Sequence, residues 1–238
     1  MLNTQLHRTL LAILLLLVMS AFAATPCEPA FTTNNNKNIT ISSADYAFEK
    51  NPLLNTISAR YVENYLAENT ANLELIKEKS KSTFAMMDGV FKKYKLPLQL
   101  KYLAVIESEL KPTAVSKVGA VGTWQLMPET AKILGLKISA TEDERRNTPK
   151  STKAAALYLR DLHTEFKDWL LVLAAYNCGP GPIYAAMKRS GSKNFWLLQK
   201  YLPKESRTHV HKFIATHQFF EGNDQAESLD NWKYLALQ

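Results

Sequence analysis

Glu107 is the acidic side chain whose position in the sequence best suits proton transfer. Leu100, Leu103 and Glu107 follow one another at spacings of three and four residues, so a helix through them places all three on one face. A carboxylate that faces an apolar core is costly unless it is hydrogen-bonded or keeps its proton. Such a group can donate a proton to an oxygen atom and take one back, so Glu107 is the candidate acid and base. The alternative is a helix-end glutamate that faces water, as we expect of Glu109.

A glycine-rich segment follows this helix and carries hydroxyl, amide and thioether side chains. Ser116, Gln125 and Met127 surround Gly119 and Gly122. A hydroxyl and an amide can bind the hydroxyl and N-acetyl groups of a sugar, and a polarizable apolar side chain can pack against a sugar ring. Glycine lets a backbone approach a ligand closely. The segment therefore predicts a sugar-binding loop, and the alternative is a tight surface turn.

Tyr176 and Asn177 lie at the end of a segment, 169–176, that is apolar on all sides and so predicts a buried helix. Polar groups at a buried helix end need hydrogen-bond partners. We interpret Tyr176 as lining the same cleft, and Asn177 as holding an N-acetyl group or the backbone near a reacting sugar. For each residue, capping of the helix end is the alternative.

The elements that must position these residues are mainly helices. A helix that begins near Leu96-Pro97 and ends at Lys111-Pro112 would carry Glu107. Residues 113–127 lack a helical stripe and predict a loop with short extended pieces. Within it, Trp124 is either a sugar platform or a core residue, and the core is favoured. Further helices are expected over 84–94, from Pro128 to Gly135, from Thr148 to Phe166, from Asp168 to Tyr176 and onward from Pro203. The fold class is therefore mainly α (α+β), with a small β element.

Residues 1–23 have the pattern of a secretory signal peptide. His7 and Arg8 precede an apolar run over 10–18, and residues 21–23 form a small-x-small cleavage site. The run is shorter than the ~20 residues that span a bilayer comfortably, which disfavours a transmembrane anchor. Both interpretations predict export, to the periplasm or cell envelope.

The remaining chain divides into four parts by composition. Residues 24–55 are rich in Thr, Asn and Ser and predict a flexible linker. Residues 56–80 predict an N-terminal helical segment. Residues 81–221 form the domain that holds every candidate residue, and residues 222–238 form a C-terminal tail.

Neither the cysteines nor the histidines predict a metal site. Cys27 and Cys178 could form a disulfide, but Cys27 lies in the expected linker, so two independent thiols are favoured. A lipid anchor on Cys27 is disfavoured, because small apolar residues do not precede it. His209 and His211 are two positions apart and do not share a helix face, and His217 completes no zinc-binding pattern. We therefore expect no metal and no cofactor.

The formal net charge of +7 suits an anionic partner such as a cell wall, a membrane surface or a nucleic acid. The lysines and arginines are dispersed and form no long basic run, which disfavours nucleic acid. A cell-wall polymer as partner, peripheral association with a membrane and a monomeric protein are the resulting expectations.

Three blocks in this order resemble the lytic transglycosylases of the soluble-transglycosylase (SLT) catalytic-domain type, nearest their membrane-bound D subgroup. The blocks are Glu107-Ser108, the glycine segment 116–127 and the Tyr-Asn segment 174–181, and the resemblance covers about 81–220. It implies a goose-lysozyme-like catalytic domain over 81–221. It also implies non-hydrolytic cleavage of peptidoglycan between N-acetylmuramic acid and N-acetylglucosamine, which forms 1,6-anhydromuramic ends.

By that resemblance Glu107 is the catalytic residue, and the substrate-binding residues are Ser116, Gln125, Met127, Tyr176 and Asn177. There are two departures from the family pattern. Cys178 stands where the family usually has Ala or Ser, and His209 stands where its late cleft tyrosine is expected. His209 either lines the cleft or is an exposed helix residue.

The implied mechanism needs one carboxylate where most glycosidases use two. Glu107 would protonate the bridging oxygen and then take the proton of the C6 hydroxyl of the same muramic sugar, which is the nucleophile. Two alternatives stay open: a goose-type muramidase that hydrolyses the same bond, and an inactive cell-wall-binding protein.

Overall fold

A computed structural model of the chain describes residues 52–222, with side chains from residue 59 onward. The expected signal peptide, Cys27, most of the expected linker and the tail beyond residue 222 lie outside the described residues. The chain divides into two units, 1–57 and 58–238, and the description below concerns the second. None of the helices between residues 52 and 222 combines the length and the apolar character that crossing a bilayer would require.

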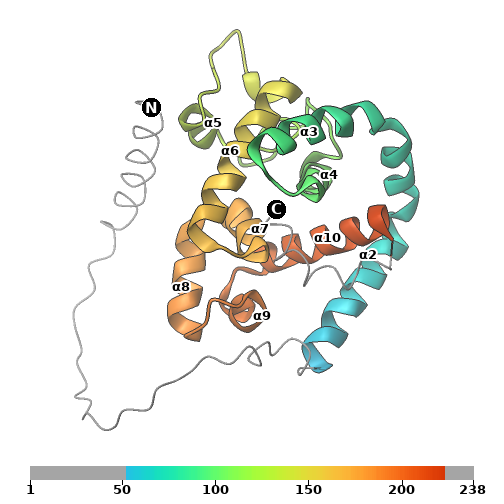
Figure 1. Ribbon diagram of the computed structural model, residues 1–238, viewed down its shortest axis with the longest axis vertical. Helices are drawn as coiled ribbons and strands as arrows, with labels where there is room; N and C mark the ends of the chain where they lie inside the picture. The colour runs from blue at the N-terminus through green and yellow to red at the C-terminus, as the bar shows by residue number, and fades with distance from the viewer. Residues whose placement is uncertain (1–51, 223–238) are drawn as a thin grey trace, which may run out of the picture. The chain divides into compact units, whose positions relative to one another are not determined.

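The described residues form nine α-helices joined by short loops and 3₁₀ turns (Figure 1). Within residues 52–222, the only β-structure consists of isolated β-bridges. The prediction of a mainly α fold is therefore confirmed. In chain order the helices are α2 (Pro52–Lys79), α3 (Lys81–Tyr94), α4 (Tyr102–Ser108), α5 (Pro128–Ile133), α6 (Thr148–Phe166), α7 (Trp169–Cys178), α8 (Pro180–Ser190), α9 (Phe195–Leu198) and α10 (Lys204–Glu221).

Helix α7 is buried in the core, as its apolar sequence predicts. Its residues 171–175 are fully buried, and the helix packs against α6, α8 and α10. Burial of each large aliphatic side chain contributes about 1.5–3 kcal/mol. Asp168 caps the helix, because its Oδ1 accepts a hydrogen bond of 3.0 Å from the Leu171 N–H. The C-terminal end of α7, which carries Tyr176 and Asn177, is thereby held inside the domain.

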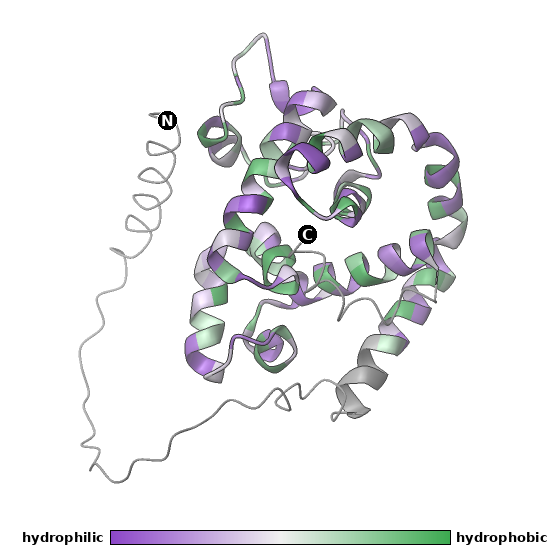
Figure 2. Ribbon diagram, in the orientation of Figure 1, coloured by the Kyte–Doolittle hydropathy of each residue, from purple (hydrophilic) through white to green (hydrophobic). Residues whose placement is uncertain are grey.

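Helix α10 differs from α7 in being amphipathic. Figure 2 shows hydrophilic and hydrophobic residues alternating along it. Val210 and Phe213 are fully buried, whereas Lys204 and Glu205 at its start are exposed. The buried face packs against α4 and α7, which brings the last helix of the domain against the helix that carries Glu107.

Trp124 is a core residue, so the alternative of a sugar platform is wrong. Its side chain is fully buried, and its ring centroid lies 5.9 Å from that of Phe91 in α3. The indole Nε1 donates a hydrogen bond of 2.9 Å to Thr152 Oγ1 in α6. Trp124 therefore anchors the middle of the glycine-rich segment to two helices.

Some helices differ in detail from the sequence expectation. Helix α4 ends at Ser108 rather than at Lys111-Pro112, because Glu109 and Leu110 adopt left-handed backbone conformations. Helix α6 has the expected bounds, and Asn147 caps it, because its Oδ1 accepts a hydrogen bond of 3.0 Å from the Lys150 N–H. Helix α8 was not expected, because its glycine and proline residues at 179–182 resemble a loop; Pro180 is instead tolerated in the first turn.

Candidate active site

Glu107 points into the domain, whereas Glu109 faces water as expected. The side chain of Glu107 is 15% exposed and that of Glu109 is 43% exposed. Glu107 Oε1 lies 2.8 Å from His209 Nε2 in α10. Glu109 instead forms an ion pair with Lys111 at the surface. The short helix α4 thus turns one of its two carboxylates toward the core and the other outward.

Two hydrogen bonds join the glycine-rich segment to helices α4 and α7. Ser108 Oγ, next to the candidate acid, donates to the Thr123 carbonyl at 2.8 Å. Tyr176 Oη, at the end of α7, donates to the Trp124 carbonyl at 2.7 Å. The segment is therefore fixed between the C-terminal ends of α4 and α7.

Two further hydrogen bonds close a circuit through α10. Ser206 Oγ donates to Asn177 Oδ1 at 2.9 Å, and His209 lies one turn further along the same helix, against Glu107. Asn177 thus bonds across to another helix. The circuit runs from α4 through the glycine-rich segment to α7, then to α10 and back to α4. Among the described residues that form this circuit, Glu107 provides the one carboxylate.

Burial and the nearby Glu107 affect the pKa of Tyr176. Burial, and next the nearby charge of Glu107, raise the pKa of Tyr176 well above its usual value. The ring of Tyr158 lies 5.5 Å from that of Tyr176, and burial raises the pKa of Tyr158 to about 12. The hydroxyl of Tyr176 therefore keeps its proton and remains a hydrogen-bond donor at any pH at which the protein works.

For the peptidoglycan cleavage that the family resemblance implies, Tyr176→Phe and Asn177→Ala are each expected to lower turnover by about tenfold. Each substitution removes a hydrogen bond of the circuit that contributes a net ~1–1.5 kcal/mol. Clearing of purified sacculi at saturating substrate measures the effect. Tyr184→Phe is a matched control, because its hydroxyl bonds Glu165 outside the circuit. Full turnover by folded Asn177→Ala would reduce that residue to a structural role.

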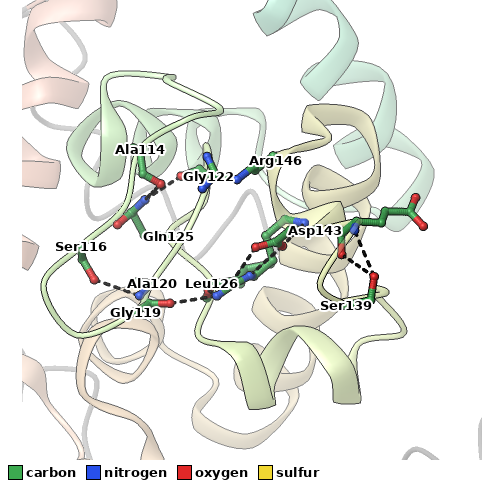
Figure 3. Close-up of polar contacts among 12 residues, drawn as sticks. Ala114, Ser116, Gly119, Ala120, Gly122, Gln125, Leu126, Ser139, Asp143 and Arg146 are labelled. Atoms are coloured by element: carbon green, nitrogen blue, oxygen red, sulfur yellow. Dashed lines mark hydrogen bonds and ion pairs between the residues drawn. The ribbon is translucent and has the colours of Figure 1, made fainter.

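The glycine-rich segment forms the small β element that the sequence predicts. Val121 makes isolated antiparallel bridges with Val115 and with Leu126. Ser116 stabilises the turn between Val115 and Val121, because its Oγ accepts a hydrogen bond of 2.9 Å from the Ala120 N–H (Figure 3). Ser116 therefore lies at the start of a hairpin-like turn.

Gln125 and Met127 lie at the other end of this segment. Gln125 has a left-handed backbone, with φ of 46°, and its Nε2 donates to the Gly122 carbonyl at 2.8 Å (Figure 3). Met127 is 43% exposed. The hydrogen bonds of Ser116 and Gln125 stay within the loop. The structure thus places Ser116, Gln125 and Met127 on one loop, but ties none of them directly to Glu107.

Glycine is favoured at the two glycine positions of the loop for different structural reasons. A Cβ atom on Gly122 would lie 2.0 Å from the Arg145 carbonyl oxygen, and its φ is +84°. A Cβ on Gly119 would meet nothing within 4 Å, although its φ is +91°. The close backbone approach at Gly122 is therefore to Arg145 of the same chain, whereas the sequence suggested a ligand.

Arg145 holds the loop together and was missed by sequence reasoning. Its side chain is buried, and one guanidinium nitrogen donates to the carbonyls of Gly119 at 2.9 Å and Leu126 at 3.0 Å. Asp143 pairs with the same guanidinium at 2.8 Å, and this contact lowers the pKa of that carboxyl. In the sequence, residues 143–146 are four consecutive charged residues, a pattern typical of a solvent-exposed segment. Nothing in the sequence therefore indicates that the Arg145 side chain is buried.

The three histidines of α10 are all buried but have separate surroundings. His209 contacts Glu107, so the alternative of an exposed helix residue is wrong. His211 packs against aromatic rings that include Tyr61, and His217 packs against Tyr102. Across the described residues, no cluster of three or more His, Cys, Asp or Glu side chains could hold a metal ion.

Residues 90–199 match the family described as "Transglycosylase SLT domain". The chain is 39% identical over 132 residues to "Membrane-bound lytic murein transglycosylase D" of Escherichia coli (strain K12), which covers 53% of this chain and 29% of that protein. It is 40% identical over 84 residues to "Peptidoglycan transglycosylase gp16" of Escherichia phage T7, which covers 34% of this chain and 6% of that protein. The chain thus spans less than a third of the length of either relative.

A solved structure of the lytic transglycosylase Slt from Pseudomonas aeruginosa, an inactive mutant in which glutamine replaces a glutamate, has a similar fold. The TM-score is 0.51 at 25% identity, over 60% of this chain and 24% of that one. This likeness agrees with the lysozyme-like, mainly α fold that was expected. The matched range contains Glu107, the glycine-rich loop, Tyr176 and Asn177, and residues 90–199 of this chain are therefore a transglycosylase SLT domain.

Proposed function

We propose that this protein cleaves the glycosidic bond between N-acetylmuramic acid and N-acetylglucosamine in peptidoglycan without water, leaving 1,6-anhydromuramic ends. The observation that carries the proposal is the inward carboxylate of Glu107, the one carboxylate among the described residues that form the hydrogen-bond circuit. Hydrolytic glycosidases generally need a second carboxylate as nucleophile or base. An internal nucleophile removes that need, because the substrate supplies its own attacking hydroxyl.

The reaction balances with Glu107 acting twice. Its carboxyl proton passes to the bridging oxygen, which leaves as the hydroxyl of N-acetylglucosamine when the C1–O bond breaks. The C6 oxygen of the muramic sugar then bonds to C1, and its proton passes to the Glu107 carboxylate. The acid is thereby regenerated. An intramolecular attack of this kind can have an effective molarity of about 10⁵ M or more.

The other candidate residues serve as positioning groups in this proposal. Tyr176 and Asn177 orient the cleft wall beside Glu107, to which they are tied through the circuit. Ser116 and Gln125 offer an oxygen each to sugar hydroxyl or N-acetyl groups, and exposed Met127 offers apolar surface to a ring.

The relatives support the same chemistry. The names of the Escherichia coli and phage T7 proteins state murein and peptidoglycan transglycosylase activity for those proteins. The Slt mutant from Pseudomonas aeruginosa is described as inactive with a glutamate changed to glutamine. One glutamate is thus needed for the activity of that protein, and the proposal assigns the same need to Glu107 here.

We further propose the setting that this activity requires. Residues 1–23 act as a signal peptide that exports the protein to the periplasm, residues 24–55 act as a linker, and residues 81–221 act as the catalytic domain. The protein works as a monomer on glycan strands. Its formal net charge of +7, of which Arg8 in the signal peptide contributes one, favours peripheral contact with anionic wall or membrane surfaces.

Product analysis tests the proposed reaction directly. Sacculi are digested with the full chain, and the released muropeptides are separated and weighed by mass spectrometry. Anhydromuramic ends lack one water relative to reducing ends, so their dominance is the expected result. Reducing ends would identify a muramidase, and a zymogram without clearing would identify a wall-binding protein without activity.

A further inference from the structure

We propose that His209 is a positioning residue for the acid, and that it donates a hydrogen bond from Nε2 to Oε1 of Glu107 while its Nδ1 carries no proton. This bond leaves Oε2 as the oxygen that carries the transferable proton. The inference rests on the proposed function and adds to it a residue that lies beyond the matched range 90–199.

The contact between His209 and Glu107 is short and enclosed. The Nε2–Oε1 distance is 2.8 Å, and the side chains are 9% and 15% exposed. The two residues come from different helices that pack against each other, α10 and α4. Water therefore competes weakly for the bond, and the ring limits the rotation of the carboxyl group.

The surroundings of the other ring nitrogen select the tautomer. His209 Nδ1 is buried and has no hydrogen-bond partner in the structure. A proton on Nδ1 would leave a buried N–H donor without a partner, and such orphaned donors are rarer in proteins than unpaired acceptors. The Nε2–H tautomer avoids this arrangement, because its donor is used by Glu107. A charged imidazolium would again place an unsatisfied N–H at Nδ1.

This tautomer is compatible with both states of Glu107 in the proposed cycle. When Glu107 is the acid, Oε1 is its carbonyl oxygen and accepts from Nε2–H, so the proton lies on Oε2. When Glu107 is the base, the same bond stabilises the carboxylate, and Oε2 is free to take the C6 hydroxyl proton. His209 thus keeps one orientation of the carboxyl group through both steps, without itself transferring a proton.

Two substitutions separate hydrogen bonding from packing. His209→Gln places an amide N–H near the position of Nε2, whereas His209→Leu removes the donor but fills similar space. We expect His209→Leu to lower kcat by roughly 10- to 100-fold, the worth of a hydrogen bond to a charged group, with KM within about twofold. The kcat of His209→Gln should stay within about fivefold of the kcat of the unmodified protein. His217→Leu is the matched control, because His217 is buried on the same helix against Tyr102.

The tautomer itself is measured on the full chain, independently of activity. Long-range ¹H–¹⁵N spectra of ¹⁵N-histidine-labelled protein distinguish protonated from unprotonated ring nitrogens, and the His209 signals are those lost in His209→Gln. We expect a protonated Nε2 and an unprotonated Nδ1. A protonated Nδ1 would overturn the proposal, whatever the kinetics show.

The outcomes also separate this inference from the proposed function. Anhydro products from the unmodified protein, with full kcat in folded His209→Leu, would refute the role of His209 and leave the function standing. Absence of anhydro products would refute the function, while the spectra would still decide the tautomer. Should His209→Leu not fold, the spectra decide, and a loss of kcat in His209→Gln beyond about tenfold would count against the donor role.

Discussion

Glu107→Gln is expected to abolish cleavage of peptidoglycan and leave the fold intact. The amide is similar in size to the carboxyl and can still accept the bond from His209, but it can neither give nor take the proton that the reaction needs. General acid or base catalysis contributes about 10²–10⁴-fold, and here one group performs both steps. We therefore expect a loss of at least about 10³-fold in the release of anhydro ends from sacculi.

Glu109→Gln is the control for this substitution. It makes the same chemical change two residues away, at an exposed side chain whose partner is Lys111 at the surface. Circular dichroism and thermal melting verify that both variants fold. Near-normal cleavage by a folded Glu107→Gln protein would falsify the assignment of the acid, and an inactive Glu109→Gln protein would show that the loss is not specific.

Gly122→Ala is expected to destabilise the domain by about 3 kcal/mol or more. A left-handed backbone costs a non-glycine residue about 1–2 kcal/mol, and insertion of an atom into a packed site adds about 1–3 kcal/mol. The inserted Cβ would lie 2.0 Å from the Arg145 carbonyl oxygen, a backbone atom that cannot turn aside. Urea unfolding followed by circular dichroism measures the change.

Gly119→Ala isolates the steric part of that effect. Gly119 has a similar φ of +91°, but a Cβ there meets nothing within 4 Å, so about 1–2 kcal/mol is expected. If the two variants unfold at the same urea concentration, then the contact between Gly122 and Arg145 does not hold the loop. Gly122→Ala should also lower activity, because a shift of the loop would disturb Trp124 and its bond to Tyr176.

Several parts of the site follow from local patterns that a sequence displays. Periodicity placed Glu107 on an inward helix face, and an unbroken apolar run predicted that α7 is buried. The helix was expected to begin at Asp168, and in the structure Asp168 caps its first turn. The pattern failed where local signals conflict: Gly179 and Pro180 resemble a loop, although proline is compatible with the first turn of α8.

The remaining parts of the site depend on residues distant in the chain. His209 lies 102 residues from Glu107, and the length and position of α10 alone do not show which of its three histidines meets the acid. Arg145 is 26 residues from Gly119, and a buried guanidinium has the same sequence appearance as a solvated one.

By itself, the sequence determined the mainly helical fold class, the inward carboxylate and the family to which the domain belongs. These depend on periodicity, caps and short motifs, which act over a few residues along the chain. Only the tertiary structure decided which partners those groups have: His209 for Glu107, Ser206 for Asn177 and Arg145 for the glycine-rich loop. The physical reason is that side-chain hydrogen bonds reach about 3 Å, so the packing of whole helices selects each partner.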